Sequence, residues 1–189
     1  MTSGDGSQSA ELRLLTERLC LRDFAEEDLS DVHELRADPE VANFMDFAPE
    51  SLEEAQVWLD GVIFHNRVQL RKAYNLAIVE LSENRVIGHI GIGDSERYLT
   101  EGELSFGYML KRNYWGKGYA TEAVRRILDF GFTVLHGRRI TATCNEENRA
   151  SARVLEKTGL RFERRFVDSE PKSGQSAVCL EFSVSASPR

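Results

Sequence analysis

The sequence predicts a single α/β (α+β) domain: a central, mostly antiparallel mixed sheet of about seven strands, flanked by helices. Length is the first observation, because 189 residues that are 41% hydrophobic suffice for one substantial core and are few for two. The second is that short segments of alternating apolar residues are interspersed with segments of helical periodicity. The third is that no internal repeat and no interdomain linker interrupts this pattern.

The predicted elements follow one another closely along the chain. Strands are marked by alternating apolar residues between turn formers, and helices by apolar residues three and four positions apart. In chain order, we expect a strand at 18–24, helices at 25–38 and 51–70, strands at 74–81, 85–93 and 102–110, a helix starting near 119, a strand at 138–145, a helix at 149–159, and strands at 160–167 and 176–184.

Local signals define several element ends. Pro39 is expected to stop the first helix, and Ser51 with Glu54 three positions later forms a capping box that opens the second. Turn formers at 82–84 separate two strands, and Gly159 is typical of a helix end. The resulting order of elements predicts a mostly antiparallel sheet.

The net charge of −7 is divided unevenly along the chain. Residues 1–60 carry sixteen Asp and Glu against four Arg, whereas residues 111–161 carry eleven Lys and Arg against five Asp and Glu. Both regions could be ordinary solvated surface, or they could offer separate faces to a cationic and an anionic ligand. A chain this acidic is not expected to bind nucleic acid.

The ends and the cysteines of the chain favour a cytoplasmic protein. Residues 1–11 lack the basic and apolar blocks of a signal peptide, so we expect a disordered leader, a domain over 12–184 and a short tail over 185–189. No apolar run approaches the roughly 18 residues that cross a bilayer, so no membrane partner is expected. Three cysteines in no Cys-x-x-Cys pair favour a reducing compartment over disulfides or a thiolate zinc site.

Residues 113–124, NYWGKGYATEAV, place two glycines around a lysine just where a helix is expected to start. A helix start leaves backbone N–H groups without partners and carries partial positive charge. Gly116 and Gly118 lack the Cβ atoms that would keep a phosphate away from those amides. The stretch therefore indicates either a phosphate site or a tight structural turn. Its spacing matches neither a Walker A loop nor a dinucleotide fingerprint.

This stretch resembles motif A of the GNAT superfamily of acetyl-CoA-dependent N-acetyltransferases, [Gln/Arg]-x-x-Gly-x-[Gly/Ala]. The motif falls on residues 115–120, with Trp115 in place of Gln or Arg. Together with TERLCLR at 16–22 and DPEV at 38–41, it is similar to the RimJ/RimL-type branch, which acetylates protein N-termini and other amines. The resemblance extends over about residues 12–184.

A second stretch, NEENRASARVLEKTGLRFE, carries the other motif of the family. Four of its residues stand at the family's spacing: Asn148, Ser151, Lys157 and Gly159. Two motifs in the expected order, each in its expected structural setting, make the resemblance specific. The four histidines show no metal-ligand spacing, so no metal is expected.

The resemblance implies acetyl-CoA as co-substrate. In GNAT enzymes the strand before motif A splays from the next strand, pantetheine lies along its backbone, and pyrophosphate lies on the motif A amides. The implied binding residues are Tyr108, Met109, Leu110, Trp115, Gly116, Lys117, Gly118, Tyr119, Ala120, Asn148 and Ser151. Lys117 or Arg112 could add charge or be solvated, and Asn148 could cap its helix or also bond to pantetheine.

The resemblance also implies direct attack by the amine in a ternary complex. Glu103, at the start of the strand before motif A, is the expected general base, directly or through water, or else a surface residue. Ser151 is expected on the side of the leaving thiol, or else caps its helix. An oxyanion donor is expected at the amide of Met109 or Leu110. Many GNAT enzymes carry a tyrosine acid where this chain has Leu155.

The expected activity is acetyl-CoA-dependent N-acetylation of a primary amine, in a protein N-terminus or a small cationic molecule. In GNAT enzymes the first strand and the next two helices form much of the acceptor side, here residues 17–70. The acidic charge of residues 1–60 therefore predicts an acceptor with further positive charge. The alternative is an inactive fold that binds acetyl-CoA as a sensor or interaction module. A homodimer is compatible with the resemblance.

Overall fold

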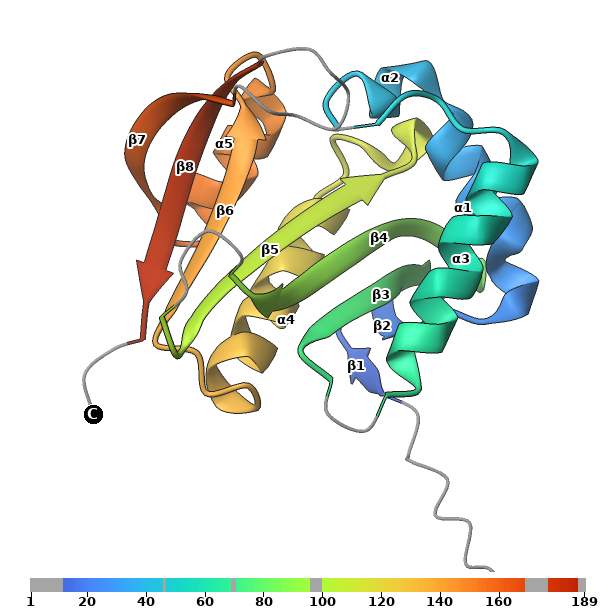
Figure 1. Cartoon of the computed structure of the whole chain (residues 1–189), viewed down its shortest axis with the longest axis horizontal. Helices are drawn as coiled ribbons and strands as arrows, with labels where there is room; N and C mark the ends of the chain where they lie inside the picture. Colours follow the sequence, from blue (N-terminus) through green and yellow to red (C-terminus); the bar gives the residue numbers. More distant parts are fainter. Residues whose placement is uncertain (1–11, 46, 69–70, 96–99, 169–176, 187–189) are drawn as a thin grey trace, which may run out of the picture.

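Within the described residues, eight strands form one mixed sheet in the order β1-β2-β3-β4-β5-β6-β8-β7, and helices cover both of its faces (Figure 1). The computed structural model describes residues 12–45, 47–68, 71–95, 100–168 and 177–186. The strands are β1 (Arg13–Leu15), β2 (Leu19–Asp23), β3 (Ala73–Glu80), β4 (Arg85–Asp94), β5 (Glu103–Leu110), β6 (Arg139–Asn145), β7 (Arg161–Asp168) and β8 (Ala177–Ser185). The helices are α1 (Leu29–Ala37), α2 (Pro39–Ala42), α3 (Leu52–Asn66), α4 (Tyr119–Thr133) and α5 (Arg149–Lys157), with 3-10 turns at Glu26–Asp28 and Arg112–Tyr114.

The predicted fold class is confirmed. Among the neighbouring strands of the described sheet, β5 and β6 run parallel and all other pairs run antiparallel. The structure adds β1, which pairs with β2 and has only three residues, too few to show an alternating pattern. The leader expected over residues 1–11 and positions 187–189 of the expected tail lie outside the described residues.

Pro39 does more than stop the first helix. α1 ends at Ala37, and Pro39 then occupies the first position of α2. Proline fits this position because the amide it lacks would have no partner within the helix. Asp38 caps α2, since its side chain accepts a hydrogen bond of 2.9 Å from the amide of Glu40.

Three hydrophobic clusters hold the helices against the sheet, and the smallest joins Leu35 of α1 and Val41 of α2 to Met109 of β5. α3 opens with the predicted capping box and packs with the neighbouring α1 on one face of the sheet. α4 and α5 pack on the other face. Gly131 permits the close approach of α4, because an added Cβ would lie 2.7 Å from Cδ1 of Ile140 and 2.8 Å from Cδ1 of Ile92. No helix in the described part of the chain is long and apolar enough to span a membrane.

The predicted splay of two strands is present between β5 and β6. These strands pair only where Glu103, Leu104 and Ser105 face residues 139–141. Beyond that point β5 stays paired with β4 as far as Leu110, while β6 diverges and pairs with β8 (Figure 1). The second half of β5 therefore has one edge that none of the described strands covers.

Candidate active site

Two pockets meet where β5 leaves β6. The loop pocket, of about 590 Å³, lies between the end of β5, residues 114–121 and the start of α5. The outer pocket, of about 920 Å³, lies between the α2 segment (α2 and the residues after it, up to 49), β5, β6 and the start of β8. Six residues border both pockets: Phe44, Met45, Tyr108, Glu147, Asn148 and Ser151. The two chain segments that carry the sequence motifs thus form a common wall.

The glycine loop presents free backbone amides at the start of α4. Gly116 and Gly118 have φ angles of +73° and +85°, a region that favours glycine, and Gly118 is the N-cap of α4. In the described structure, no hydrogen bond engages the amides of residues 116–121. Space around Gly116 is open, because an added Cβ would meet nothing within 4 Å. The loop therefore fits an anionic group, as the first turn of a helix does.

Arg18 contacts the glycine loop and the first turn of α4. Its guanidinium donates to the carbonyl of Lys117 at 3.1 Å, pairs with Glu122 at 2.7 Å and lies 4.3 Å from the ring centroid of Tyr119. Thr16 donates to the same Glu122 carboxylate at 2.7 Å. The TERLCLR segment therefore supports the start of α4. The sequence shows this segment as a motif but does not show which residue it contacts.

The cations of the loop pocket come from α5. Arg149, Arg153 and Lys157 line it, and their spacing of four positions places them on one face of the helix. Lys117, which the sequence suggested for this role, does not line the pocket, and its Nζ lies 5.5 Å from the ring centroid of Tyr114. Arg112 instead pairs with Asp38 at 3.6 Å.

The charged residues that line the outer pocket are all acidic: Glu146, Glu147 and Asp168. Glu146 is paired with Arg165 at 2.7 Å, so it adds little net charge to the lining. The part of 17–70 that lines it, residues 39–49, contributes only uncharged side chains among those described. Many acids of residues 1–60 instead form ion pairs within the fold. The pairs are Asp23 with Arg71, Asp28 with Arg22, Asp31 and Glu34 with Lys111, Asp38 with Arg112, and Glu50 with Arg36. Among the described residues, the acidic lining therefore comes from the β6–α5 loop and from β7, not from the N-terminal region.

Tyr108, Met109 and Leu110 line the loop pocket as the end of β5. Trp115 donates its indole N–H to the carbonyl of Leu110 at 2.8 Å, so it ties the strand end to the loop. Trp115, which stands where the motif has Gln or Arg, therefore has a structural role. Leu155 stands where many GNAT enzymes carry a tyrosine acid. It is apolar and buried, with 1% of its surface exposed, so this position supplies no acid to the site.

Asn148 and Ser151 lie at the start of α5. The side-chain oxygen of Asn148 accepts a hydrogen bond of 3.0 Å from the amide of Ser151, so Asn148 does cap the helix. The Ser151 hydroxyl lies 3.1 Å from the Tyr108 phenol oxygen. Burial raises the pKa of Tyr108 to about 12, and the hydrogen bond with Ser151 acts in the opposite direction. Burial likewise raises the pKa of the nearby Cys144 thiol to about 11.

Glu103 lies at the other end of β5 from these residues. It pairs with Arg139 at 2.9 Å and lines neither the loop pocket nor the outer pocket. The structure therefore does not bring Glu103 together with Ser151. Glu147, which the sequence did not single out, borders both pockets with an exposed side chain. The described residues make no hydrogen bond or ion pair with its carboxylate.

Comparison with known proteins agrees with this architecture. The family model described as an acetyltransferase (GNAT) domain matches residues 18–161. The uncharacterized N-acetyltransferase YnaD of Bacillus subtilis is 33% identical over 164 residues, which is 87% of this chain and 91% of YnaD. A GNAT-family acetyltransferase structure from Bacillus anthracis has a TM-score of 0.78 at 29% identity, over 92% of this chain and 98% of that one.

The fold is also shared with a more distant enzyme. The spermidine N-acetyltransferase of Vibrio cholerae, solved in complex with CoA and spermine, has a TM-score of 0.74 at 20% identity, over 90% of this chain and 96% of that one. At this identity the likeness shows a shared fold. The chain belongs to the GNAT family and is an N-acetyltransferase. In the described part of the chain, no group of His, Cys, Asp and Glu side chains could hold a metal ion.

Proposed function

We propose that this N-acetyltransferase transfers the acetyl group of acetyl-CoA directly to a primary amine of a cationic acceptor. The observation that carries the proposal is the meeting of two oppositely charged pockets. Three cations and one acid line the loop pocket, whereas the charged residues that line the outer pocket are Glu147, Asp168 and Glu146, the last of which is paired with Arg165. An anionic donor and a cationic acceptor would therefore approach the shared wall from different sides.

The loop pocket fits acetyl-CoA. The amides of residues 116–120 would hold the pyrophosphate, with added charge from Arg149, Arg153 and Lys157 on α5. The amide of Trp115, also expected in this role, instead donates to the carbonyl of Arg112 at 3.0 Å. The uncovered edge of β5 at residues 108–110 would pair with the pantetheine arm, and Asn148 retains a side-chain NH₂ that could donate to it. Bound there, acetyl-CoA supplies an activated thioester.

The outer pocket fits the acceptor. Its acidic lining favours a protein N-terminus with neighbouring Lys or Arg, or a small polyamine-like or aminoglycoside-like molecule. The Vibrio cholerae enzyme of this fold holds spermine, so the fold can accept a cationic amine. For this chain the inference rests on its own lining residues. Whether it belongs to the RimJ/RimL-type branch depends on the acceptor.

Each catalytic task can be given to a group of this chain. The amide of Lys111 donates to Ile87 of β4, and alternate amides of an antiparallel strand face opposite edges, so the amide of Leu110 and not that of Met109 faces the uncovered edge. The amide of Leu110 is therefore the proposed oxyanion donor. Ser151, supported by Tyr108, is the proposed hydrogen-bond donor to the leaving thiolate. For the general base, position favours Glu147, which borders both pockets. Glu103 could act only through water, after its ion pair with Arg139 opens.

Direct transfer can be tested by the intact mass of the protein. If the acetyl group passes straight to the amine, mixing the protein with acetyl-CoA alone should leave its mass unchanged on the timescale of turnover. Adding a basic peptide should then acetylate the peptide. A chain that becomes acetylated and then passes the group to the peptide would refute direct attack. A cytoplasmic location is also proposed, because Cys20 and Cys144 are free thiols and the sequence has no Cys-x-x-Cys pair.

A further inference from the structure

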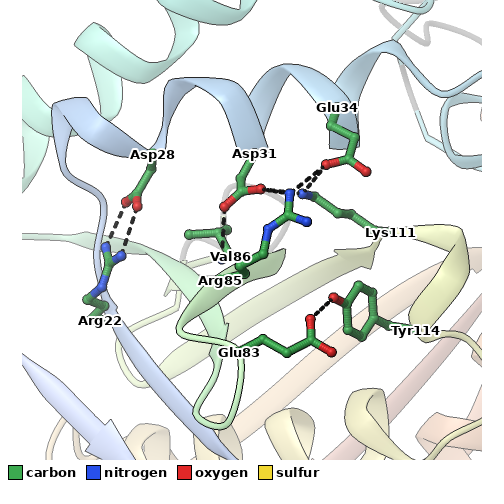
Figure 2. A network of polar contacts seen from close by, with 9 residues as sticks. All are labelled: Arg22, Asp28, Asp31, Glu34, Glu83, Arg85, Val86, Lys111 and Tyr114. Atoms are coloured by element: carbon green, nitrogen blue, oxygen red, sulfur yellow. Dashed lines mark hydrogen bonds and ion pairs between the residues drawn. The ribbon is translucent and has the colours of Figure 1, made fainter.

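Lys111 is a nearly buried cation at the point where β5 ends and the loop begins. Its side chain is 7% exposed, and its Nζ donates to Oδ1 of Asp31 at 2.7 Å and to Oε2 of Glu34 at 2.6 Å. Both carboxylates belong to α1, and Figure 2 shows them reaching down from the helix to the lysine. A buried ammonium is costly unless it is paired, so this contact constrains the position of the strand end.

The same carboxylates also receive a cation from β4. Arg85 donates to Asp31 at 2.6 Å and to Glu34 at 3.1 Å, and the amide of Val86 donates to the other oxygen of Asp31 at 3.2 Å (Figure 2). The backbone amide of Lys111 donates to the carbonyl of Ile87 at 2.8 Å. β4, the end of β5 and α1 are therefore joined at one place.

This cluster links the two walls of the loop pocket. Asp38 alone separates α1 from α2, and the α2 segment supplies Val41, Phe44 and Met45 to one wall. On the other side, Lys111 directly follows Leu110 and precedes the loop that ends at α4. Lys111 itself does not line either pocket. A second link joins the same loop to the sheet, because the Tyr114 phenol donates to Glu83 in the β3–β4 turn (Figure 2).

We propose that Lys111 is a positioning residue for acetyl-CoA binding: through Asp31 and Glu34 it fixes the spacing between the α1–α2 wall and the strand-and-loop wall of the pocket. The inference rests on the proposed function, since it concerns the same pocket. Without the ammonium, the two carboxylates keep Arg85 and the amide of Val86 as partners, and the end of β5 loses its ionic contact with α1. The packing of Met109 with Leu35 remains, but it is apolar and less directional. The α1–α2 wall and the strand-and-loop wall would then no longer be held at a fixed spacing around the pocket.

The ion pair of Arg22 with Asp28, at the start of the same helix, provides a matched control. Arg22 donates to Asp28 at 2.7 Å and 2.8 Å, and Asp28 directly precedes α1 (Figure 2). This ion pair is also largely buried, with 18% and 5% of the side chains exposed. Neither residue lines the loop pocket or the outer pocket. Arg22→Met should therefore destabilise the same helix without moving the cofactor loop.

The test is the Kd for acetyl-CoA, measured by titration calorimetry, beside the thermal midpoint of each variant. We expect Lys111→Met to raise the Kd by about tenfold or more, and Lys111→Arg to recover part of the loss. At saturating acetyl-CoA, kcat should stay within about threefold of wild type, because Lys111 touches neither substrate. Arg22→Met should lower the midpoint and leave the Kd unchanged.

Equal Kd values for wild type and Lys111→Met would overturn the inference, as would an equal rise in Arg22→Met. If Lys111→Met does not fold, Glu34→Gln replaces it, because Glu34 is half exposed and its loss is milder. An unchanged Kd in Glu34→Gln would then overturn the inference. A wild-type protein that binds no acetyl-CoA would instead refute the proposed function, and this inference would fall with it.

Discussion

The phenol oxygen of Tyr108 lies 3.1 Å from the hydroxyl oxygen of Ser151, although the two residues are 43 positions apart. Tyr108 belongs to β5 and Ser151 to the first turn of α5, so the contact bridges the gap left where β6 diverges. It also joins the two sequence motifs in space. Both hydroxyls border the loop pocket and the outer pocket, where a donor and an acceptor would meet.

Ser151→Ala should lower kcat by roughly tenfold to a hundredfold, because the leaving thiolate would lose a hydrogen-bond donor. The loss should persist at alkaline pH, since deprotonating the amine does not replace that donor. Tyr108→Phe should cause a smaller loss and leave the pH profile unchanged below about pH 10. Burial holds the pKa of Tyr108 at about 12, so the phenol stays protonated over that range. A Ser151→Ala variant that recovers at high pH would contradict the assignment.

Glu147→Gln should reduce kcat/KM near neutral pH by about 10²-fold or more, as expected for loss of a general base. Activity should recover in part as pH rises, because more of the amine is then already deprotonated. Glu103→Gln is the comparison, and we expect it to keep the wild-type pH profile because its carboxylate is paired with Arg139 at the far end of β5. Alkaline recovery in Glu103→Gln alone would identify Glu103, acting through water, as the base.

Gly118→Asp should abolish the thermal stabilisation that acetyl-CoA gives to the wild type. A ligand at a hundredfold excess over its Kd adds about 2.7 kcal/mol to the folded state. The new carboxylate would repel phosphate at the start of α4. Gly118→Ala is the control for backbone strain, because both variants impose a side chain at a φ of +85°. A full response in Gly118→Asp would mean that phosphate binds elsewhere.

Asp31 should make the fold sensitive to acid. Burial acts to raise the pKa of Asp31, but hydrogen bonds from Lys111 and Arg85 outweigh it and hold that pKa below its usual range. A depressed pKa in the folded state stabilises the protein above the unfolded value of about 3.9, and this contribution is lost as pH falls through the folded pKa. Urea unfolding below pH 5 should therefore show a shrinking stability gap between wild type and Asp31→Asn. A gap that stays constant would contradict this linkage.

Much of the fold could be predicted because its signals are local. Capping by Ser51 and Glu54, the turn before β4 and the glycine loop each specify backbone geometry over a few neighbouring residues. The splay of β5 from β6 was expected from the resemblance to GNAT enzymes, because the periodicity of the sequence does not indicate it. β1 was missed because three residues carry no readable period.

The site was harder to predict because the ion-pair partner of a charged side chain often lies far away in the sequence. The sequence predicts that the acids of residues 1–60 attract a cationic acceptor. In the structure, however, Lys111 and Arg85 pair with Asp31 across about fifty positions or more. The α5 cations had a usable signal, since Arg149, Arg153 and Lys157 repeat every four positions. No comparable pattern marks Glu147, whose position at the border of two pockets depends on the tertiary fold.

The most direct test is thiol release from acetyl-CoA with two matched peptides, one with Lys or Arg after its N-terminus and one with Asp or Glu. We predict that the basic peptide is acetylated with the higher kcat/KM at low salt. Its advantage should shrink as the Debye length falls from about 30 Å at 0.01 M to about 8 Å at 0.15 M ionic strength. The same assay with a panel of other amines extends the test to small acceptors. Binding of acetyl-CoA without thiol release for any amine would contradict the proposed activity, and equal or reversed preference for the acidic peptide would contradict the role of the acidic outer pocket.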